Sequence, residues 1–266
     1  MKKILALAFL IAIFLVPQVA YAVSVTSGLT EEVVVSPGEK VTGVITLRNS
    51  GETPETVRAY QTDYLFHADG RTVYGEPGST PRSNASWITI YPTEVTLPPG
   101  GEATIHYQIE VPSENLAGTY WSMVMIEPQA PPPEEITPEE GKIQLGIQTV
   151  LRYGVQIVTH LGDSGKRELN ILDRQISKEG EDYLLALDLE NSGERWLRPE
   201  VRAEIYDEEG RLLGKKGGEK YRIYPETSVR ATLNLGALSP GKYKILVVID
   251  NGDQYIWGAQ YSLNLQ

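Results

Sequence analysis

The chain has 266 residues, a formal net charge of −11 at pH 7 and no cysteine. The acidity argues against nucleic acid or an anionic membrane surface as a partner. Without cysteine the fold cannot depend on disulfides or on a cysteine-based zinc site, so its stability must come from apolar burial. The length is sufficient for two domains of ordinary size, each with its own core.

The amino terminus has the pattern of a secretory signal peptide. Lys2 and Lys3 precede an apolar stretch from Ile4 to Val16, and the small residues Ala20 and Ala22 follow it. This stretch is shorter than the about 20 residues that span a bilayer, so we expect cleavage after Ala22. No later stretch is long enough for a membrane span. The sequence therefore predicts a signal peptide at 1–22 and a periplasmic or secreted mature protein.

The rest of the chain has the two-residue period of β-strands. Apolar residues alternate with polar ones in five long runs, which are Ala103–Val111, Val201–Ile205, Val229–Leu235, Tyr243–Ile249 and Tyr255–Leu265. Turn-forming sequences such as Ser36-Pro37-Gly38 and Pro240-Gly241 separate such runs. Short strands with regular turns predict an all-β fold, and no segment shows a convincing helical period.

An internal repeat divides this fold into two. Leu47–Glu52 reads LRNSGE and Leu189–Glu194 reads LENSGE, and in each half a Tyr-Pro pair and a Gly-x-Tyr sequence follow in the same order. The repeat predicts two tandem immunoglobulin-like β-sandwich domains, at 23–161 and 162–266. We expect seven strands in each, mostly antiparallel.

Residues 127–141 depart from the strand pattern and should form an extended loop, because the prolines and glutamates of EPQAPPPEEITPEEG leave little to bury. A long alternation follows, from Ile143 to Leu161. Between Ile143 and Leu151 it contains no charge. An uncharged edge strand is a ready template for strand addition, so this segment is the predicted partner-binding edge. The open alternative is that its apolar face packs inside the first sandwich.

Residues for catalysis or metal binding are scarce. The three histidines are His67, His106 and His160; the last two fall on polar strand faces, where we expect solvated side chains. No nucleophile motif or calcium-loop spacing is present. Asn84-Ala85-Ser86 matches a glycosylation acceptor only weakly, and the four tryptophans are expected in the packing. The sequence thus predicts a protein that is not an enzyme and needs no cofactor or metal.

The first half resembles a known group. The sequences SPGEKVTGVITLRNSGETPETVRAY, SNASWITIYPTEVTLPPGGEATIHYQIEVP and LAGTYWSMVMIEP are similar to the amino-terminal domain of the PapD-like periplasmic pilus-assembly chaperones, and also to related immunoglobulin-like domains of bacterial cell-surface proteins. The second half fits the same family more loosely. This resemblance implies a PapD-like sandwich, which by itself carries many functions.

The resemblance also implies a mode of binding. Such chaperones donate part of the last strand of the first domain to an unfinished fibre subunit. Arg152, and less well Lys142, could supply the cation that the family places on this strand, whereas Val23–Leu29 contains no Arg or Lys. The expected partner is an exported surface or pilus-like protein subunit rather than nucleic acid or a small molecule. A structural or adhesive envelope protein is the alternative. The expected partner-binding residues are Ile143, Leu145, Ile147, Leu151, Arg152 and Tyr153.

Overall fold

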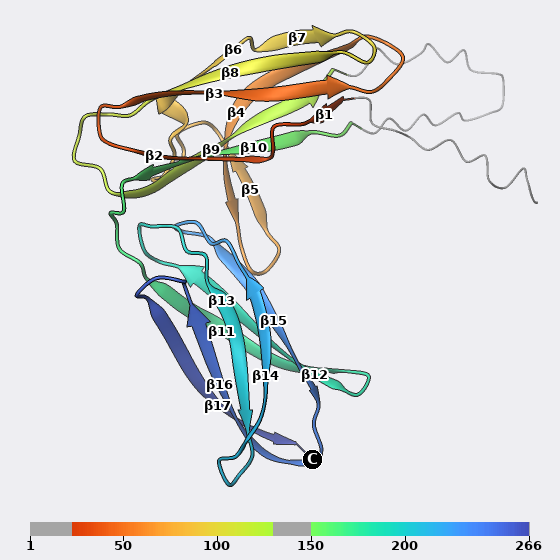
Figure 1. The fold of residues 1–266 in the computed structure, drawn as a ribbon, viewed down its shortest axis with the longest axis vertical. Coiled ribbons are helices and arrows are strands. Elements are labelled where there is room, and N and C mark those ends of the chain that lie inside the picture. Colours follow the sequence, from red (N-terminus) through yellow and green to blue (C-terminus); the bar gives the residue numbers. More distant parts are fainter. Residues whose placement is uncertain (1–22, 130–149, 266) are drawn as a thin grey trace, which may run out of the picture.

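The computed structural model describes residues 23–129 and 150–265, which form two β-sandwiches in tandem (Figure 1). The predicted all-β, immunoglobulin-like architecture is confirmed. No described helix has the length and apolarity needed to cross a membrane. The first sandwich consists of β1 (Val23–Val25), β2 (Thr30–Val35), β3 (Lys40–Asn49), β4 (Glu55–Phe66), β5 (Thr72–Gly75), the short 3₁₀ helix η1 (Ala85–Trp87), β6 (Ile88–Tyr91), β7 (Glu94–Leu97), β8 (Glu102–Glu110), β9 (Gly118–Pro128) and β10 (Tyr153–Leu161).

Two sheets make up the first sandwich. One has the order β1-β3-β8-β6, and the other has the order β2-β10-β9-β4-β5, with β7 also paired to β4. The prediction of seven strands is wrong here, because the amino-terminal segment is divided between the sheets and the short strands β5 and β7 are added to β4. β1 pairs with β3, whereas β2 crosses over and pairs with β10 in parallel. The amino-terminal segment therefore ties the two sheets together.

The core of the first sandwich follows the predicted alternation. Ile105 and Ile109 of β8 are fully buried, as are Val124 of β9 and Val155 and Ile157 of β10 in the facing sheet. Side chains alternate across a strand, so the polar residues between them lie on the outer faces. His106 is exposed in this way, as expected.

The second sandwich has the seven strands that the sequence predicts. They are β11 (Leu169–Glu179), β12 (Asp182–Asn191), β13 (Glu200–Tyr206), β14 (Leu212–Lys220), β15 (Ser228–Ala237), β16 (Gly241–Asp250) and β17 (Ile256–Leu265). They form the sheets β11-β12-β15 and β14-β13-β16-β17. Leucines of β12 pack between the sheets against Ile245 and Val247 of β16.

The repeated Asn-Ser-Gly sequence has the same structural role in both sandwiches. Asn49 and Asn191 are fully buried at the ends of β3 and β12. In each case the amide Nδ2 donates to the carbonyl four residues later, and the amide oxygen accepts from the N–H of the glycine two residues later. A buried amide needs partners for all its groups. The repeat is therefore a hydrogen-bonded corner that each sandwich uses after its equivalent strand.

The two sandwiches meet through direct main-chain contact. Thr119 N–H of β9 donates to the carbonyl of Glu194 at 2.8 Å, and Trp196 N–H donates to Thr119 Oγ1 at 3.0 Å. Gly118 has a positive φ of 85°, and a Cβ there would lie 2.2 Å from the carbonyl oxygen of Glu194. Only glycine permits this approach.

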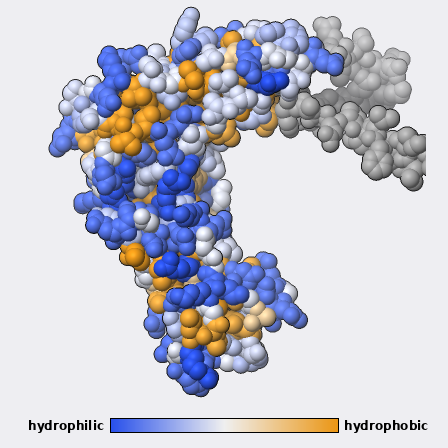
Figure 2. Space-filling view, in the orientation of Figure 1, coloured by the Kyte–Doolittle hydropathy of each residue, from blue (hydrophilic) through white to orange (hydrophobic). Residues whose placement is uncertain are grey.

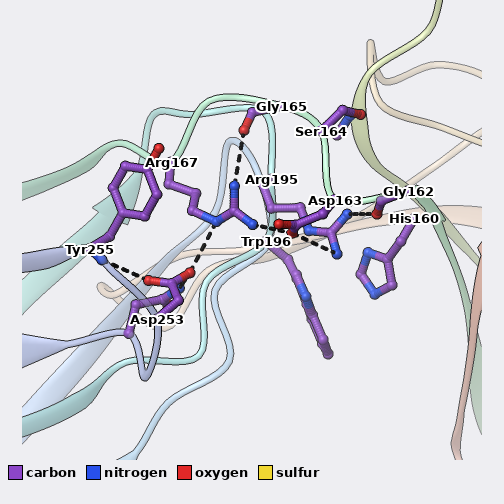
Figure 3. Close-up of polar contacts among 12 residues, drawn as sticks. His160, Gly162, Asp163, Ser164, Gly165, Arg167, Arg195, Trp196, Asp253 and Tyr255 are labelled. Atoms are coloured by element: carbon purple, nitrogen blue, oxygen red, sulfur yellow. Dashed lines mark hydrogen bonds and ion pairs between the residues drawn. The ribbon is translucent and has the colours of Figure 1, made fainter.

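Ion pairs fix the connection between β10 and β11 to the second sandwich (Figure 3). Arg195 donates to the carbonyl of Gly162 at 2.6 Å. Arg167 pairs with Asp163 and, through Nε, with Asp253 at 3.1 Å. These contacts hold both ends of the connection. The two sandwiches lie at an angle to each other, so that the molecule is bent at the connection (Figure 1).

Candidate functional site

A groove of about 630 Å³ lies on the sheet of the first sandwich that contains β10. We call it the elbow groove, because the second sandwich contacts the same sheet further along. The face of the molecule seen in Figure 2 is mostly hydrophilic, with separate hydrophobic patches. The residues that line the groove are Leu29, Thr30, Tyr60, Thr62, Tyr64, Tyr74, Met123, Met125, Arg152, Gly154 and Gln156.

Strand alternation determines which residues of β10 reach the groove. Tyr153 is partly buried in the core, followed by the fully buried Val155 and Ile157. Arg152, Gly154 and Gln156 point to the opposite face and line the groove. Of the predicted edge Ile143–Tyr153 the structure describes only the last residues, and among these Tyr153 packs against the core.

The groove borders an unpaired stretch of strand edge. On one side β10 pairs with β9 along its whole length, from Tyr153 to Leu161. On the other side, pairing with β2 begins only at Gln156, whose N–H donates to Leu29 O at 2.9 Å. Main-chain groups alternate between the two edges of a strand, so those of Gly154 point the same way as those of Gln156. No described strand pairs with them there.

One end of the groove carries a small charged cluster. Arg152 Nε lies 3.5 Å from Glu127 Oε2, and the same carboxylate oxygen accepts a hydrogen bond from Tyr60 at 2.8 Å. Burial and the neighbouring Glu127 raise the pKa of Tyr60. The guanidinium of Arg152 remains largely exposed, so it can also contact a bound segment.

The other end is closed by the second sandwich. Gln156 Oε1 accepts hydrogen bonds from Thr30 at 3.3 Å and from the hydroxyl of Tyr224 at 2.9 Å. Arg222 donates to Thr30 Oγ1 and pairs with Glu32 at 3.2 Å. Burial raises the pKa of Tyr224, so its hydroxyl keeps its proton and acts as a donor.

An aromatic cluster continues from this end into the contact between the sandwiches. Trp121 stacks on Tyr224 with ring centroids 4.4 Å apart, and Trp196 stacks on the same tyrosine at 5.8 Å. Tyr64 meets Trp121 edge to face. Trp121 and Trp196 are buried as expected, but they join the two sandwiches rather than the two sheets of one.

The predicted partner-binding residues are only partly placed. Ile143, Leu145 and Ile147, like Lys142 and most of the 127–141 loop, lie outside the described residues. Leu151 is half-buried just before β10, Tyr153 faces the core, and Arg152 lies at the groove. Of the predicted set that is described, Arg152 alone lines the groove.

Two polar residues differ from their predicted surroundings. His160 was expected to be solvated, but it is 3% exposed, because the outer face of β10 is covered by the second sandwich at this point. Its Nδ1 lies 3.0 Å from Thr119 Oγ1, and its ring lies 4.7 Å from that of Trp196. Asn84 is fully buried and donates to Ile157 O and Thr159. Its side chain is therefore inaccessible as a glycosylation acceptor in the folded protein.

The methionines and tyrosines of the groove were not identified from the sequence. The available signal was in β9, where TYWSMVMIEP has apolar residues on both faces: Val124 and Ile126 face the core while Trp121, Met123 and Met125 face outward. A strand of this kind has both faces covered or in use. No cluster of three or more His, Cys, Asp or Glu suited to a metal ion occurs in the described ranges.

Comparison with known proteins finds similarity at the level of structure. No protein-family model matches the chain, and no curated protein matches it. A solved chaperone–tip adhesin complex of CFA/I fimbriae biogenesis has a chain that is 13% identical with a TM-score of 0.46, covering 92% of this chain and 100% of that one. The class 5 fimbriae chaperone CfaA is 13% identical with a TM-score of 0.44, covering 90% and 98%.

A third similar structure is the CsuC–CsuE chaperone–tip adhesion subunit pre-assembly complex from the archaic chaperone–usher Csu pili of Acinetobacter baumannii. It is 11% identical with a TM-score of 0.41, covering 79% of this chain and 90% of that one. Each of these three structures is a fimbrial or pilus chaperone, alone or in a complex, at 11–13% identity and TM-scores of 0.41–0.46. At these identities the similarity concerns the fold.

Proposed function

We propose that this protein is an exported, non-enzymatic binding module that receives an extended segment of a protein partner along the free edge of β10. The observation that carries the proposal is the edge at Gly154, which pairs with no described strand on this side and lies directly beside the elbow groove. A strand added there would gain main-chain hydrogen bonds from the edge, and the groove would receive its alternate side chains. In this role the protein would act as a periplasmic chaperone for surface or fimbrial subunits.

The chemistry of the groove supports an apolar, adaptable partner segment. Met123 and Met125 offer flexible, polarizable surface, which suits binding of varied side chains. Tyr60, Tyr64 and Tyr74 add rigid rings with hydroxyls that can bond to a polar backbone. Arg152 supplies a positive charge at the entrance, which favours a partner with an acidic group near that end.

A matched pair of double variants tests the site. Tyr74 and Leu29 line the groove and are 60% and 49% exposed, so Tyr74→Asp with Leu29→Asp should leave the fold intact. Tyr91 and Val44 line a different hollow on the opposite sheet and are 74% and 45% exposed. Tyr91→Asp with Val44→Asp is therefore the control.

The partner is first captured from a native extracytoplasmic extract with the wild-type protein, identified by mass spectrometry and purified. We expect the groove variant to bind it at least about tenfold more weakly, equivalent to about 1.4 kcal/mol, at an unchanged melting temperature. The control should bind as the wild type does. The proposal would be contradicted if the groove variant and the control bound the partner with equal affinity, if only the control lost affinity, or if no partner were captured. Loss in the control alone would favour an adhesive or structural role.

A further inference from the structure

The last strand of the second sandwich is an edge without the usual protection. β17 pairs with β16 on one side and ends the sheet β14-β13-β16-β17 on the other, at the border of the second sandwich (Figure 1). Its ten residues, IWGAQYSLNL, include no charged residue and no proline. Every second residue along it is exposed, starting with Ile256. Long, uncharged edges of this kind pair readily with another chain.

The other exposed edges are blunted in recognised ways. β14 contains Lys215, Lys216, Glu219 and Lys220, and β11 contains Asp173, Arg174, Lys178 and Glu179. β2 has Glu31 and Glu32, while β5 has only four residues. Charge and short length both discourage edge-to-edge pairing. The edge strand β15 (Ser228–Ala237) carries one charged residue, Arg230. Among the described edge strands of nine residues or more, β17 is the one without any charged residue.

The alternation of hydrogen-bonded and non-bonded pairs between β16 and β17 shows which main-chain groups of β17 point to the free edge. Asn251 N–H donates to Tyr255 O at 3.1 Å across the turn that precedes the strand. Bonded and non-bonded pairs alternate in an antiparallel ladder, so Trp257, Ala259 and Tyr261 bond to β16. The N–H and C=O groups of the even-numbered residues, from Ile256 to Asn264, therefore point to the free edge.

We propose that this edge pairs antiparallel with β17 of a second copy of the chain, joining two four-stranded sheets into one. Two copies of β17 related by a two-fold axis pair in antiparallel orientation. The residues that exchange main-chain hydrogen bonds must be even-numbered in both copies, because only those residues direct their N–H and C=O groups to the free edge. Placing Gln260 opposite Gln260 of the second copy satisfies both conditions and uses the whole run Ile256–Asn264. Each outward-facing residue is then opposite a small or neutral one, including Ser262 opposite Gly258.

Charge around the strand is compatible with a second copy as the occupant. Lys242 and Lys244 flank the carboxyl end of β17, opposite Asn264 and Ser262, whereas Asp250 flanks its amino end, opposite Ile256. In an antiparallel pair the basic end of one copy faces the acidic end of the other. Within each copy Lys242 also pairs with Glu208 at 2.8 Å and Asp250 with Arg202 at 3.7 Å, so the charges that flank the strand are partly neutralised and a second copy meets little repulsion there.

The test uses charge exchange at the centre of the pair. Gln260 is exposed on the outer face, so Gln260→Lys and Gln260→Glu should fold normally. Each variant alone places like charges opposite each other, which destabilises a strand pair, whereas their mixture restores opposite charges. Gln175, an exposed glutamine on the edge strand β11, receives the same two substitutions as the matched control.

Analytical ultracentrifugation of the full mature chain, up to several hundred micromolar, measures the outcome. A single strand pair buries less than the ~1,600 Å² of a standard interface, so the wild type should dimerise in the micromolar range or above. Each Gln260 variant should dimerise at least about fivefold more weakly, and the equimolar mixture should recover a heterodimer. A wild type that stays monomeric, single variants that dimerise normally, or a mixture without recovery would overturn the proposal. The Gln175 variants should match the wild type.

Discussion

At the scale of single residues, His160 makes the free energy of unfolding depend on pH. Burial, and then the positive charges of Arg195 and Arg198, lower its pKa from 6.5 to about 4. The folded protein therefore disfavours the imidazolium, whereas the unfolded chain takes up the proton below pH 6.5. Stability from this residue is fully present above pH 6.5 and falls as the pH decreases toward 4, where both states are protonated.

The expected loss between pH 6.5 and pH 4 is roughly 1 to 3 kcal/mol. Denaturant unfolding of the wild type and of His160→Asn over this range measures it, because asparagine can keep a hydrogen bond to Thr119 without titrating. Carboxylates contribute equally to both proteins, so the difference between the two curves isolates the histidine. Curves that remain parallel throughout would show that His160 is protonated at little cost in the folded state.

Two isoleucines test the cores separately. Ile105 of β8 and Ile245 of β16 are fully buried, one in each sandwich. Replacing either with alanine should lower the free energy of unfolding by about 2 to 5 kcal/mol, because a cavity is left in a packed interior. Calorimetry should assign the first loss to the first sandwich and the second to the other. Leu172→Ala, on the exposed side of β11, is the control and should change little.

At the scale of elements, the β4–β5 hairpin acts as a strut between the sandwiches. Its turn follows Phe66, whose ring lies 6.1 Å from Tyr224 and 6.3 Å from Trp121. Ala68 N–H in the turn donates to Ser228 Oγ of the second sandwich at 2.9 Å. The hairpin therefore extends the contact well beyond the short connection after β10.

Phe66→Ala should weaken this contact without opening either core. We expect about 1 to 3 kcal/mol of destabilisation, less than for a fully buried phenylalanine, together with earlier and less cooperative melting by calorimetry. X-ray scattering should show a larger radius of gyration if the bend becomes variable. Arg71→Ala, at the tip of the same hairpin and paired only with Asp69 among the described residues, is the control. If Phe66→Ala and Arg71→Ala melt at the same temperature as each other, the hairpin does not support the contact between the sandwiches.

The alternation of apolar and polar residues located those strands correctly that have one buried face and one solvated face. Ala103–Val111 and Val229–Leu235 are such segments, and the Asn49 and Asn191 corners marked the repeat. The pattern could not separate β1 from β2, because the crossover between sheets depends on long-range pairing. It also misplaced His160, since a polar-face residue becomes buried only when another domain covers that face.

At the scale of the molecule, the candidate site depends on several elements that lie far apart in the sequence. The predicted partner-binding edge was Ile143–Tyr153, and of its described residues Arg152 lines the groove. Met123 of β9 and Tyr74 of β5 also line it, and Tyr224 of the second sandwich bonds to Gln156 at one end. Local periodicity carries no information about which strands become neighbours. The two-sandwich, all-β fold class was therefore predictable from short-range patterns, whereas the groove, and the division of β1 and β2 between the sheets, depend on the assembled sheets.

The parallel pairing of β2 with β10 also determines how the first sandwich transmits mechanical load. After the three-residue strand β1, the chain enters this sheet at the start of β2 and leaves for the second sandwich at the end of β10, and β2 and β10 run in the same direction over six residue pairs. Tension along the chain would pull β2 backward and β10 forward, so their hydrogen bonds are sheared together rather than peeled one by one. Forced unfolding depends on the barrier to rupture, and simultaneous loading raises that barrier. A force that pulls the two ends of the first sandwich apart would therefore meet its main resistance at the pairing of β2 with β10.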